Sequence, residues 1–532
     1  MEPGRFISKL MSGAAGALLS TLLLTLLAGC SDKNGADGNP PTGTAGTGTA
    51  AGGSLAPAPV GTAGTQNTGT MTTGTGGTTG MTTDTGGQGA AGTGSTTDTP
   101  VPTTGASGVW PMMGFDERNW YFNPNETTLS VANAATLVEK WRFTTGGNPN
   151  GTPIIAEGKV FVMASGGGTY ALSLETGEQI WNIPALAGTA SVAYEPGFIY
   201  VHDAQSQLWK LNSADGSTVW GPQKADAQPG CDGTSSPILG GGAVVVGHSC
   251  GLREVGQGGG PNGARGGVEA HSTSDGAKLW TYWTAAETEN GAMVWSSVGI
   301  DVGAGTVFAS TGNNYTAQGP NSDAIHAIDL AAGTRKWMTQ VRDNDVWSIP
   351  AAFGGPDTDF GANPIVAGTS VAAGDKGSGF WAMNTSTGDI LWSREGLTGA
   401  RDQAHGGFLM NGAYDGKNFY GVANDTSTRG SVLYAFDGAT GNDAFPPKTF
   451  PGKYAWGAPS LANGVLAVPI NETLYLLDAS SGAELNSFNT GGTIAAGAPA
   501  IVDGYVCVGS GLAYPLATDT LDNNQVICYG LP

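Results

Sequence analysis

The chain has 532 residues, of which only 12% are charged, and its formal net charge is −21 at pH 7. This acidic excess argues against nucleic acid and against an anionic membrane surface as partners. The 89 glycines and the short polar turns favour β structure, and the chain is long enough to bury a large core.

The first 29 residues have the composition of an export signal. Arg5 and Lys9 give a basic start, residues 18–27 are almost entirely apolar, and Ala28-Gly29-Cys30 offers a small-residue cleavage site that ends on cysteine. This pattern resembles the lipobox of a bacterial lipoprotein, which implies cleavage before Cys30 and lipidation of that residue. A plain secretory signal with a chance cysteine is the alternative.

Residues 30–107 are predicted to form a flexible tether. They are almost entirely Gly, Thr, Ala and Ser without apolar periodicity, so they cannot bury enough surface to offset their chain entropy. Ser31 after the cysteine favours outer-membrane sorting, by the same resemblance to lipoproteins. We therefore expect an exported protein that faces the periplasm or the cell surface. No later segment approaches the ~20 apolar residues of a membrane-spanning helix, so the lipid would be the only membrane attachment.

Residues 108–532 carry a hairpin repeat. Each copy has a strand of alternating apolar residues, a turn with Asp or Ser followed by Gly, and a second strand that usually ends in Trp. The copies span 170–181, 208–220, 268–280, 325–337, 381–392, 433–445 and 474–485. Each hairpin is expected to be the outer pair of a four-stranded unit, and its Trp is expected to pack between neighbouring units.

An eighth unit has to be assembled from both ends of this region. Residues 526–529 supply a strand that stops short of its Trp turn, and residues 139–143, with Trp141, supply the missing final strand. Joining the two ends removes an unpaired sheet edge, which an all-β chain would otherwise expose. The sequence therefore predicts an all-β, eight-bladed β-propeller that is closed by its N- and C-terminal strands.

Four cysteines remain besides Cys30. An even number of cysteines in an oxidising compartment indicates disulfides, and proximity in the chain suggests the pairs Cys231–Cys250 and Cys507–Cys528. The sequence has no CxxC or nearby His pattern of a zinc site, so we do not expect one.

The repeated Ala-x-Asp-x-x-Thr-Gly-x-x-x-Trp pattern resembles the quinoprotein alcohol dehydrogenases, which hold pyrroloquinoline quinone (PQQ) and a calcium ion in the funnel of a propeller. Residues 110–116, 310–315, 356–361 and 374–379 resemble the polyvinyl-alcohol-dehydrogenase-like branch of that family. The resemblance implies an enzyme that oxidises small or polymeric alcohols and passes the electrons to an external acceptor. Because the chain has no CxxCH haem motif, that acceptor would be a separate cytochrome c-type protein.

The resemblance assigns roles to five side chains. It implies that Asp359 is the catalytic base and a metal ligand, that Asn313 and Glu254 are further calcium ligands, that Lys376 hydrogen-bonds the quinone oxygens, and that the quinone stacks on Trp295. Oxygen ligands suit a hard cation, and alcohol oxidation needs a base and a positive charge at the quinone carbonyls. Each role has a structural alternative. Asp359 could be a turn carboxylate that caps backbone amides, and Asn313 could stand in a left-handed turn. Lys376 could form a surface salt bridge, and Trp295 could be a packing indole.

Other features leave the assignment open. Asp357 is either a second metal oxygen or a solvated turn residue, and the glycine-rich insertion at residues 256–267 makes the alignment of Glu254 insecure. The family's adjacent cysteine pair is absent, and Phe408-Leu-Met stands where a tryptophan is expected near the funnel.

Two other functions compete with the enzyme: a non-catalytic propeller scaffold, like the lipoprotein that assists outer-membrane barrel assembly, and a carbohydrate-binding lectin. Only the enzyme requires the five side chains to converge at the axis or mouth of the ring.

Overall fold

The computed structural model describes residues 108–226, 228–254, 263–343, 345–348, 356–399, 405–410, 412–512 and 520–532. The predicted signal, the lipidation site Cys30 and the tether to residue 107 lie outside these residues and stay predictions. Within the described ranges, no helix is long and apolar enough to cross a membrane.

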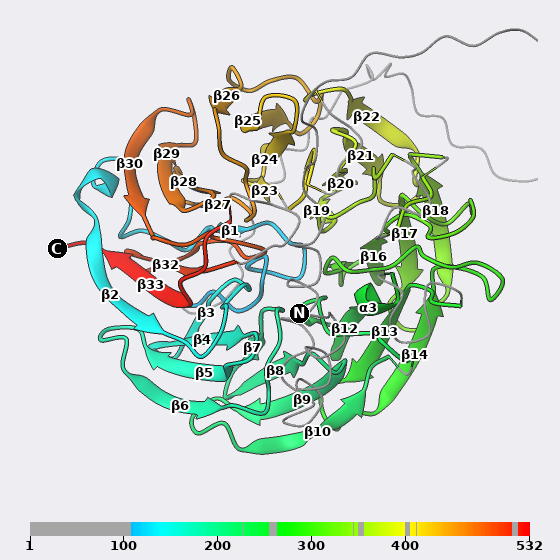
Figure 1. Ribbon diagram of the computed structural model, residues 1–532, viewed down its shortest axis with the longest axis horizontal. Coiled ribbons are helices and arrows are strands. Elements are labelled where there is room, and N and C mark those ends of the chain that lie inside the picture. Colours follow the sequence, from blue (N-terminus) through cyan, green and yellow to red (C-terminus); the bar gives the residue numbers. More distant parts are fainter. Residues whose placement is uncertain are drawn as a thin grey trace, which may run out of the picture. The chain divides into compact units, whose positions relative to one another are not determined.

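The described chain forms eight blades of four antiparallel strands around a central axis, which confirms the eight-bladed β-propeller (Figure 1). One blade gains a fifth, parallel strand, β1 (Phe122–Asn123). Blade 1 contains β3 (Ile154–Ala156), β4 (Lys159–Ala164), β5 (Gly168–Ser173) and β6 (Gln179–Ile183), and blade 2 contains β7 (Ala193–Glu195), β8 (Phe198–His202), β9 (Gln207–Asn212) and β10 (Thr218–Lys224). Blade 3 contains β11 (Ile238–Gly240), β12 (Ala243–His248), β13 (Gly267–Ser272) and β14 (Lys278–Trp283). Blade 4 contains β15 (Gly299–Asp301), β16 (Thr306–Ser310), β17 (Ala324–Asp329) and β18 (Arg335–Gln340).

Blades 5 to 8 follow in the same manner. Blade 5 contains β19 (Ile365–Ala367), β20 (Ser370–Gly374), β21 (Phe380–Asn384) and β22 (Ile390–Arg394), and blade 6 contains β23 (Ala413–Tyr414), β24 (Asn418–Asp425), β25 (Gly430–Asp437) and β26 (Lys448–Phe450). Blade 7 contains β27 (Ser460–Ala462), β28 (Val465–Ile470), β29 (Thr473–Asp478) and β30 (Glu484–Asn489). Blade 8 contains β31 (Ala500–Val502), β32 (Tyr505–Ser510), β33 (Gln525–Gly530) and β2 (Val138–Thr144). A short strand β1 (Phe122–Asn123), a 3₁₀ turn η2 (Ala134–Thr136) and a single helical turn α3 (Gly251–Glu254) complete the described elements. The first strand of each blade lies innermost.

Blade 8 closes the ring as predicted. β2, near the start of the propeller, pairs with the C-terminal β33, and Glu139 lies opposite Tyr529 and Phe143 opposite Val526. Figure 1 shows these two ends of the sequence side by side. The pairing gives β33 a neighbour on both sides, so the C-terminal strand is not left as an open edge.

The Trp of one hairpin packs on the Gly of the next hairpin and so connects neighbouring blades. Trp141 donates from Nε1 to the Leu174 carbonyl at 2.8 Å, and a Cβ on Gly177 would lie only 2.6 Å from its ring. Gly177 has φ +73°, which also favours glycine. The same pairing recurs for Trp181 with Gly216, Trp220 with Gly276, Trp280 with Gly333, Trp337 with Gly388, Trp392 with Gly441 and Phe445 with Gly482. The expected packing role of these aromatic residues is therefore confirmed.

Residues 110–123, which we call the N-terminal clasp, run around the axis and contact the inner strand of every blade in order. The partners are Ile155 (through Trp110), Tyr194 (Pro111), Leu239 (Met112), Ile300 (Glu117), Val366 (Arg118), Tyr414 (Trp120), Leu461 (Tyr121) and Ile501 (Asn123). At the centre, the Met113 sulfur accepts hydrogen bonds from Ser236, Ser297 and Asn363. The clasp thus ties the blades together and fills the axis at its end of the ring.

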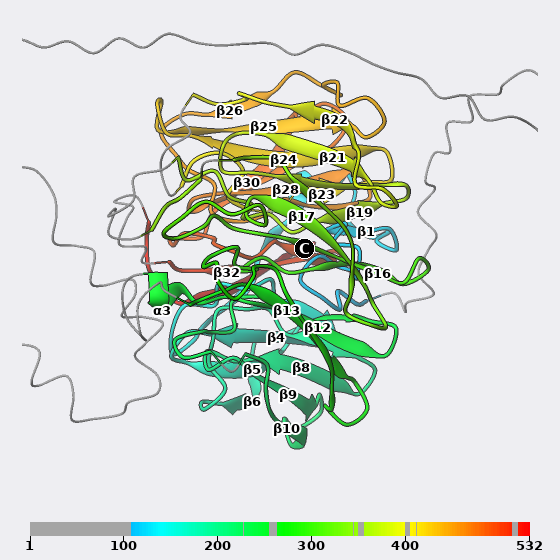
Figure 2. The same ribbon diagram turned by 90° about the vertical axis from the view of Figure 1, so that its right-hand side faces the viewer.

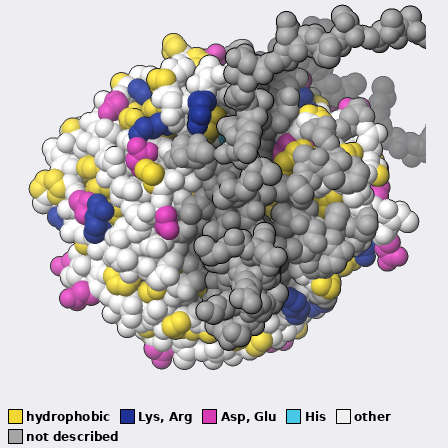
Figure 3. All heavy atoms as spheres, viewed as in Figure 1, with side chains coloured by type: hydrophobic (Ala, Val, Ile, Leu, Met, Phe, Trp, Pro, Cys, Tyr) yellow, Lys and Arg dark blue, Asp and Glu magenta, His cyan; other side chains and the backbone are white. Residues whose placement is uncertain are grey.

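The clasp and the helical turn lie at opposite ends of the ring axis. In the side view of Figure 2, β1 of the clasp appears on one side and α3 on the other. On the face seen in Figure 3, the acidic and basic side chains of the described residues are scattered among one another rather than gathered by sign.

Candidate functional site

A cavity of about 340 Å³ lies around the axis at the end away from the clasp. Trp295, Asn313, Asp359 and Lys376 all line it. Trp295 and Asp359 precede the inner strands β15 and β19, and Asn313 and Lys376 follow the second strands β16 and β20. In an antiparallel pair, the residue before one strand and the residue after the next lie at the same end. Blades 4 and 5 therefore bring all of these side chains to one place.

Trp295 forms the floor of this cavity. It also lines a second cavity of about 110 Å³, which Met113 of the clasp borders from below. The indole Nε1 donates to Asp359 Oδ2 at 3.1 Å, and Gly361 leaves room for the ring because a Cβ there would collide with it. The indole is thus fixed where it lines both cavities.

Lys376 lies between two carboxylates. Its Nζ is 2.6 Å from Asp357 Oδ1 and 2.6 Å from Asp359 Oδ1. Lys376 is 7% exposed and Asp357 0%, so the readings of Lys376 as a surface salt bridge and of Asp357 as a solvated turn residue are both wrong. The rings of Trp295 and Trp347 each lie 5.8 Å from Nζ, within cation–π range.

The acid–lysine group has strongly shifted pKa values. Burial raises the pKa of Asp357 to about 7, with Asp359 adding to the rise and Lys376 opposing it. Burial alone lowers the pKa of Lys376, but Asp357 and Asp359 outweigh it and raise that pKa well above its usual value. Lys376 therefore stays positively charged at the cavity wall.

Asn313 turns an oxygen toward the cavity. Its Nδ2 donates to the carbonyls of Asn314 at 2.8 Å and Trp347 at 2.7 Å, which uses both amide hydrogens on the backbone. The Oδ1 atom is therefore left as the group that can accept a hydrogen bond or bind a cation from the cavity side. The left-handed turn proposed as the alternative is absent at this residue, because Asn313 is not among the described residues with positive φ.

Two buried acids behind the site were not predicted from the sequence. Asp345 Oδ2 accepts hydrogen bonds from the Thr358 amide at 2.5 Å and hydroxyl at 2.8 Å, and so fixes the loop between Asp357 and Asp359. Burial, followed by Asp359, raises the pKa of Asp345 to about 6. Burial and the neighbouring Asp345 also raise the pKa of Asp323 well above its usual value. For Asp345 the available sequence signal was the density of Asp between residues 343 and 359, whereas Asp323 lies outside that stretch.

The predicted fifth residue, Glu254, is not placed by the structure. Its backbone ends α3, and its side chain lies outside the described atoms. The tryptophan expected after His405-Gly-Gly is indeed replaced, since Leu409 and Met410 line the cavity there. Trp347 and Trp456 reach the cavity from other segments, and sequence reasoning missed both. Each stands outside the blade-docking position of the repeat, which was the available signal.

The disulfides follow the predicted pairs. Cys231 is joined to Cys250 and Cys507 to Cys528. The first bond lies beside the cavity, because its neighbours Asp232, Ser249 and Gly251 line it. The second connects the adjacent strands β32 and β33 in the apolar core of blade 8.

The closed ring of eight blades with a cavity on its axis defines the class of this protein as a β-propeller with a candidate site at its centre. A family model described as "Outer membrane protein assembly factor BamB" matches residues 91–193, 125–292 and 264–413. These matches together cover more than half of the chain, which therefore belongs to this family.

Similar proteins agree with the predicted branch of quinoproteins. A polyvinylalcohol dehydrogenase of Pseudomonas sp is 27% identical over an alignment of 476 residues, and the match covers 76% of this chain and 73% of that protein. A polyvinylalcohol dehydrogenase of Sphingopyxis sp. (strain 113P3) is 25% identical over an alignment of 399 residues, and the match covers 65% of this chain and 60% of that protein. The chain thus spans less than two thirds of this second relative. The resemblance to quinoprotein alcohol dehydrogenases of the polyvinyl-alcohol-dehydrogenase-like branch is confirmed.

Among solved structures, the quinohemoprotein alcohol dehydrogenase from Comamonas testosteroni has a TM-score of 0.63 to this chain. The match covers 80% of each chain at 17% sequence identity. At this identity the likeness shows that the two proteins share the propeller fold.

Proposed function

We propose that this protein is a quinoprotein that oxidises alcohols with PQQ as its cofactor and calcium as its metal. The observation that supports this most is the convergence of Trp295, Asn313, Asp359 and Lys376 on one cavity. These residues supply a flat apolar face, two kinds of oxygen ligand and a fixed positive charge.

The residues fit both absent groups. The cavity of about 340 Å³ lies within the size range of small-molecule sites, and the indole of Trp295 forms its floor. Asn313 Oδ1 and the Asp359 carboxylate are hard oxygen donors of the kind that calcium binds. When bound, PQQ supplies a hydride acceptor and calcium supplies Lewis acidity at its carbonyl oxygen.

The chain's own side chains orient the reaction. Asp359 is held by Lys376 on one oxygen and by the Trp295 indole on the other, so the carboxylate has a fixed direction. From this position it accepts the proton of the substrate hydroxyl. Lys376 would supply a positive charge for the oxygens of a bound quinone, and Trp295 would supply an aromatic surface for its ring.

The cavity favours alcohols with an apolar carbon chain. Leu409, Trp456, Ala495 and Leu512 form one apolar cluster, and all of them line the cavity. Burying a carbon chain against such a wall contributes roughly 25 cal/mol per Å² of apolar surface. We propose a secondary alcohol, including the repeating units of a polyvinyl-alcohol-like polymer, as the substrate.

The remaining parts of the proposal concern the setting of the enzyme. Lipidation at Cys30 would anchor it to a bacterial membrane, most consistently the outer membrane by the resemblance to lipoproteins, with residues 30–107 as a tether. Electrons would leave to a separate cytochrome c-type acceptor.

The test is dye-linked alcohol oxidation by the purified protein with added PQQ and calcium. We expect turnover of secondary and polymeric alcohols, and a loss of about 10²–10⁴-fold in kcat for Asp359→Asn, which removes the base. Asp389→Asn, in an exposed turn of the same blade, is the matched control and should retain full activity. Absence of PQQ binding and of turnover, with Asp359→Asn equal to the parent, would overturn the proposal.

The second candidate is a non-catalytic scaffold lipoprotein, which the description of the matching family model favours. A scaffold needs the propeller surface but no cofactor. It is supported if the protein binds no PQQ in the presence of calcium but copurifies with outer-membrane barrel-assembly components when isolated from membranes. Tight PQQ binding that Trp295→Ala weakens would exclude a purely structural cavity.

A further inference from the structure

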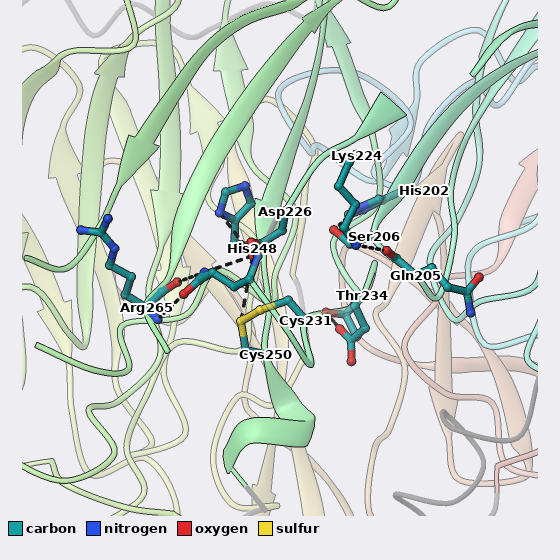
Figure 4. The surroundings of a disulfide bond; sticks show 12 residues. His202, Gln205, Ser206, Lys224, Asp226, Cys231, Thr234, His248, Cys250 and Arg265 are labelled. Atoms are coloured by element: carbon teal, nitrogen blue, oxygen red, sulfur yellow. Dashed lines mark hydrogen bonds and ion pairs between the residues drawn. A yellow bond between two sulfur atoms is a disulfide. The ribbon is translucent and has the colours of Figure 1, made fainter. Parts of the chain in front are cut away.

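A second group of metal-ligating side chains is buried beside the cavity, around the Cys231–Cys250 disulfide (Figure 4). Oδ2 of Asp226 lies 4.0 Å from Cys250 Sγ and 3.4 Å from His248 Nδ1. The ligand atoms of Asp226, Cys231 and Cys250 all lie within 4.8 Å of one another. This group uses none of the residues to which the proposed oxidation assigns a role.

His248 is buried between two carboxylates. It is 1% exposed, and its Nδ1 has no hydrogen-bond partner among the described residues, whereas Glu269 interacts with the ring from the Nε2 side. Leaving a buried polar group unsatisfied costs about 1–3 kcal/mol, so such an imidazole points to a ligand or to a charge interaction. Its Nδ1 faces Asp226, which itself is 0% exposed and lies next to the disulfide.

The other nitrogen of His248 faces a carboxylate. Its Nε2 is 3.7 Å from Glu269 Oε2, and Glu269 is held by His271 Nε2 at 2.7 Å and by the Thr281 hydroxyl at 2.7 Å. A metal-bound histidine commonly directs its second nitrogen to a carboxylate, which fixes the ring and increases its basicity. The arrangement around His248 has this form, with Nδ1 left for the metal.

We propose that Cys231, Cys250, Asp226 and His248 form a site for Zn²⁺ or a similar thiophilic cation, and that the disulfide and the metal are its alternative occupants. Opening the site takes two electrons and two protons, which convert the disulfide into two thiols. A dithiol supplies both and is itself oxidised to a disulfide, whereas a phosphine supplies the electrons and becomes its oxide while water supplies the protons and the oxygen. The metal then binds both sulfurs as thiolates and releases the two thiol protons. A small-molecule disulfide, which takes up the two electrons and leaves as two thiolates, restores the Cys231–Cys250 bond and expels the metal.

The ligand set selects the class of metal. Two thiolates, one imidazole and one carboxylate are the donors and the number that tetrahedral zinc sites use, whereas calcium prefers oxygen ligands. Metal–ligand bonds of about 2.0–2.3 Å place tetrahedral ligand atoms roughly 3.3–3.8 Å apart. The separations of 3.4 Å and 4.0 Å around Asp226 approach this range. His248 lies next to Asp226 but outside the group of mutually close ligand atoms that Asp226, Cys231 and Cys250 form, so it would have to move toward the sulfurs when the metal binds.

The other disulfide provides a matched control. Cys507 and Cys528 are separated by 21 residues and Cys231 and Cys250 by 19, so the two bonds close loops of similar length. Cys507 and Cys528 are packed in an apolar core cluster of blade 8 and do not belong to a metal-ligating group among the described residues. Reduction of this pair should therefore create thiols without a metal site.

The experiment compares two double variants of the full chain. Cys507→Ser with Cys528→Ser keeps only the proposed site, and Cys231→Ser with Cys250→Ser keeps only the control pair. Each is reduced with a phosphine without oxygen and titrated with Zn²⁺ against a chromophoric chelator, and Co²⁺ absorption reports thiolate coordination. We expect one tight Zn²⁺ per chain only in the first variant and only after reduction. The carboxylates of the main cavity are present in both variants, so weak binding there cancels.

Further substitutions in the first variant test the remaining ligands. Asp226→Asn and His248→Gln should each weaken Zn²⁺ binding at least tenfold, and Glu269→Gln should weaken it by about 10–100-fold through His248. Equal Zn²⁺ binding by the two reduced double variants would overturn the proposal, and so would affinity that none of these changes alters. If reduction unfolds the chain, near-ultraviolet circular dichroism will show it. Zn²⁺ must then restore the folded signal in the first variant alone, and failure to do so also overturns the proposal.

Discussion

The replacement of Lys376 by methionine tests the charge balance of the main cavity. In the native chain this lysine lies 2.6 Å from both Asp357 and Asp359, and all of these side chains are buried. Lys376→Met keeps most of the side-chain volume but leaves two buried carboxylates without their cation. Breaking a buried ion pair in this way costs about 3–5 kcal/mol of unfolding free energy. Lys159→Met is the matched control, because Lys159 lies 2.9 Å from Glu157 but both side chains are partly exposed, and such pairs contribute about 0–1 kcal/mol.

The pH dependence of this loss has a definite sign. Burial raises the pKa of Asp357 to about 7, and Lys376 opposes the rise, so the substitution should raise that pKa further. An acid with a raised folded-state pKa stabilises the fold at low pH and loses that contribution as the pH rises through the folded-state pKa. The deficit of Lys376→Met should therefore be larger near about pH 8 than near about pH 5.

Urea titrations followed by tryptophan fluorescence measure both effects, with cofactor absent so that binding does not contribute. Equal losses for Lys376→Met and Lys159→Met would refute the reasoning. A deficit that is the same at both pH values would show that the two carboxylates do not depend on the lysine.

Two further substitutions test the scaffold by thermal unfolding. Gly177→Ala places a Cβ 2.6 Å from Trp141 at φ +73°, whereas Gly197→Ala, at φ +85°, meets no atom within 4 Å. Both variants should lose about 1–2 kcal/mol of unfolding free energy, because alanine is disfavoured in the left-handed backbone conformation. Gly177→Ala should lose about 1–3 kcal/mol more, because its Cβ overpacks against Trp141. Equal shifts in Tm for the two variants would argue against blade docking at this turn. Asn119→Ala removes the clasp's hydrogen bonds to the carbonyls of Val298 at 2.9 Å and Pro364 at 3.0 Å, at a cost of about 1–3 kcal/mol for each buried carbonyl left unsatisfied. An unchanged Tm would mean that water replaces the amide there and that the clasp does not brace blades 4 and 5.

The fold could be predicted because its defining contact is local and periodic. A Trp at the end of one hairpin packs on the Gly of the next hairpin, so the same spacing is written into the sequence seven times, with Phe445 once in place of Trp. The closing pair of β2 and β33 could be predicted for the same reason, since each half carries its part of the repeat. The clasp could not be derived in this way, because residues 110–123 contact every blade without repeating any pattern.

Only part of the candidate site could be predicted from the sequence. Asp359 and Lys376 flank strands of one blade, and the hairpin geometry brings them together, so their meeting followed from the fold. The burial of Asp357 could not be read from Pro-Asp-Thr-Asp, which has the composition of a polar turn. Trp347 and Trp456 reach the cavity only after the ring has closed, because they come from segments far apart in the chain.

The buried acids bear on the choice between an enzyme and a scaffold. Asp357 and Asp359 share one lysine, and Asp323 and Asp345 are buried close enough to Asp359 to feel its charge. Burial disfavours the charged form of a carboxyl group, and together with the neighbouring carboxylates it raises the pKa values of Asp323 and Asp345. A propeller that serves only as a scaffold gains nothing from this arrangement. A cavity that holds a divalent cation does gain from this arrangement. The ion compensates the excess of acidic groups, and the acids behind the site fix the ligands of the ion in place.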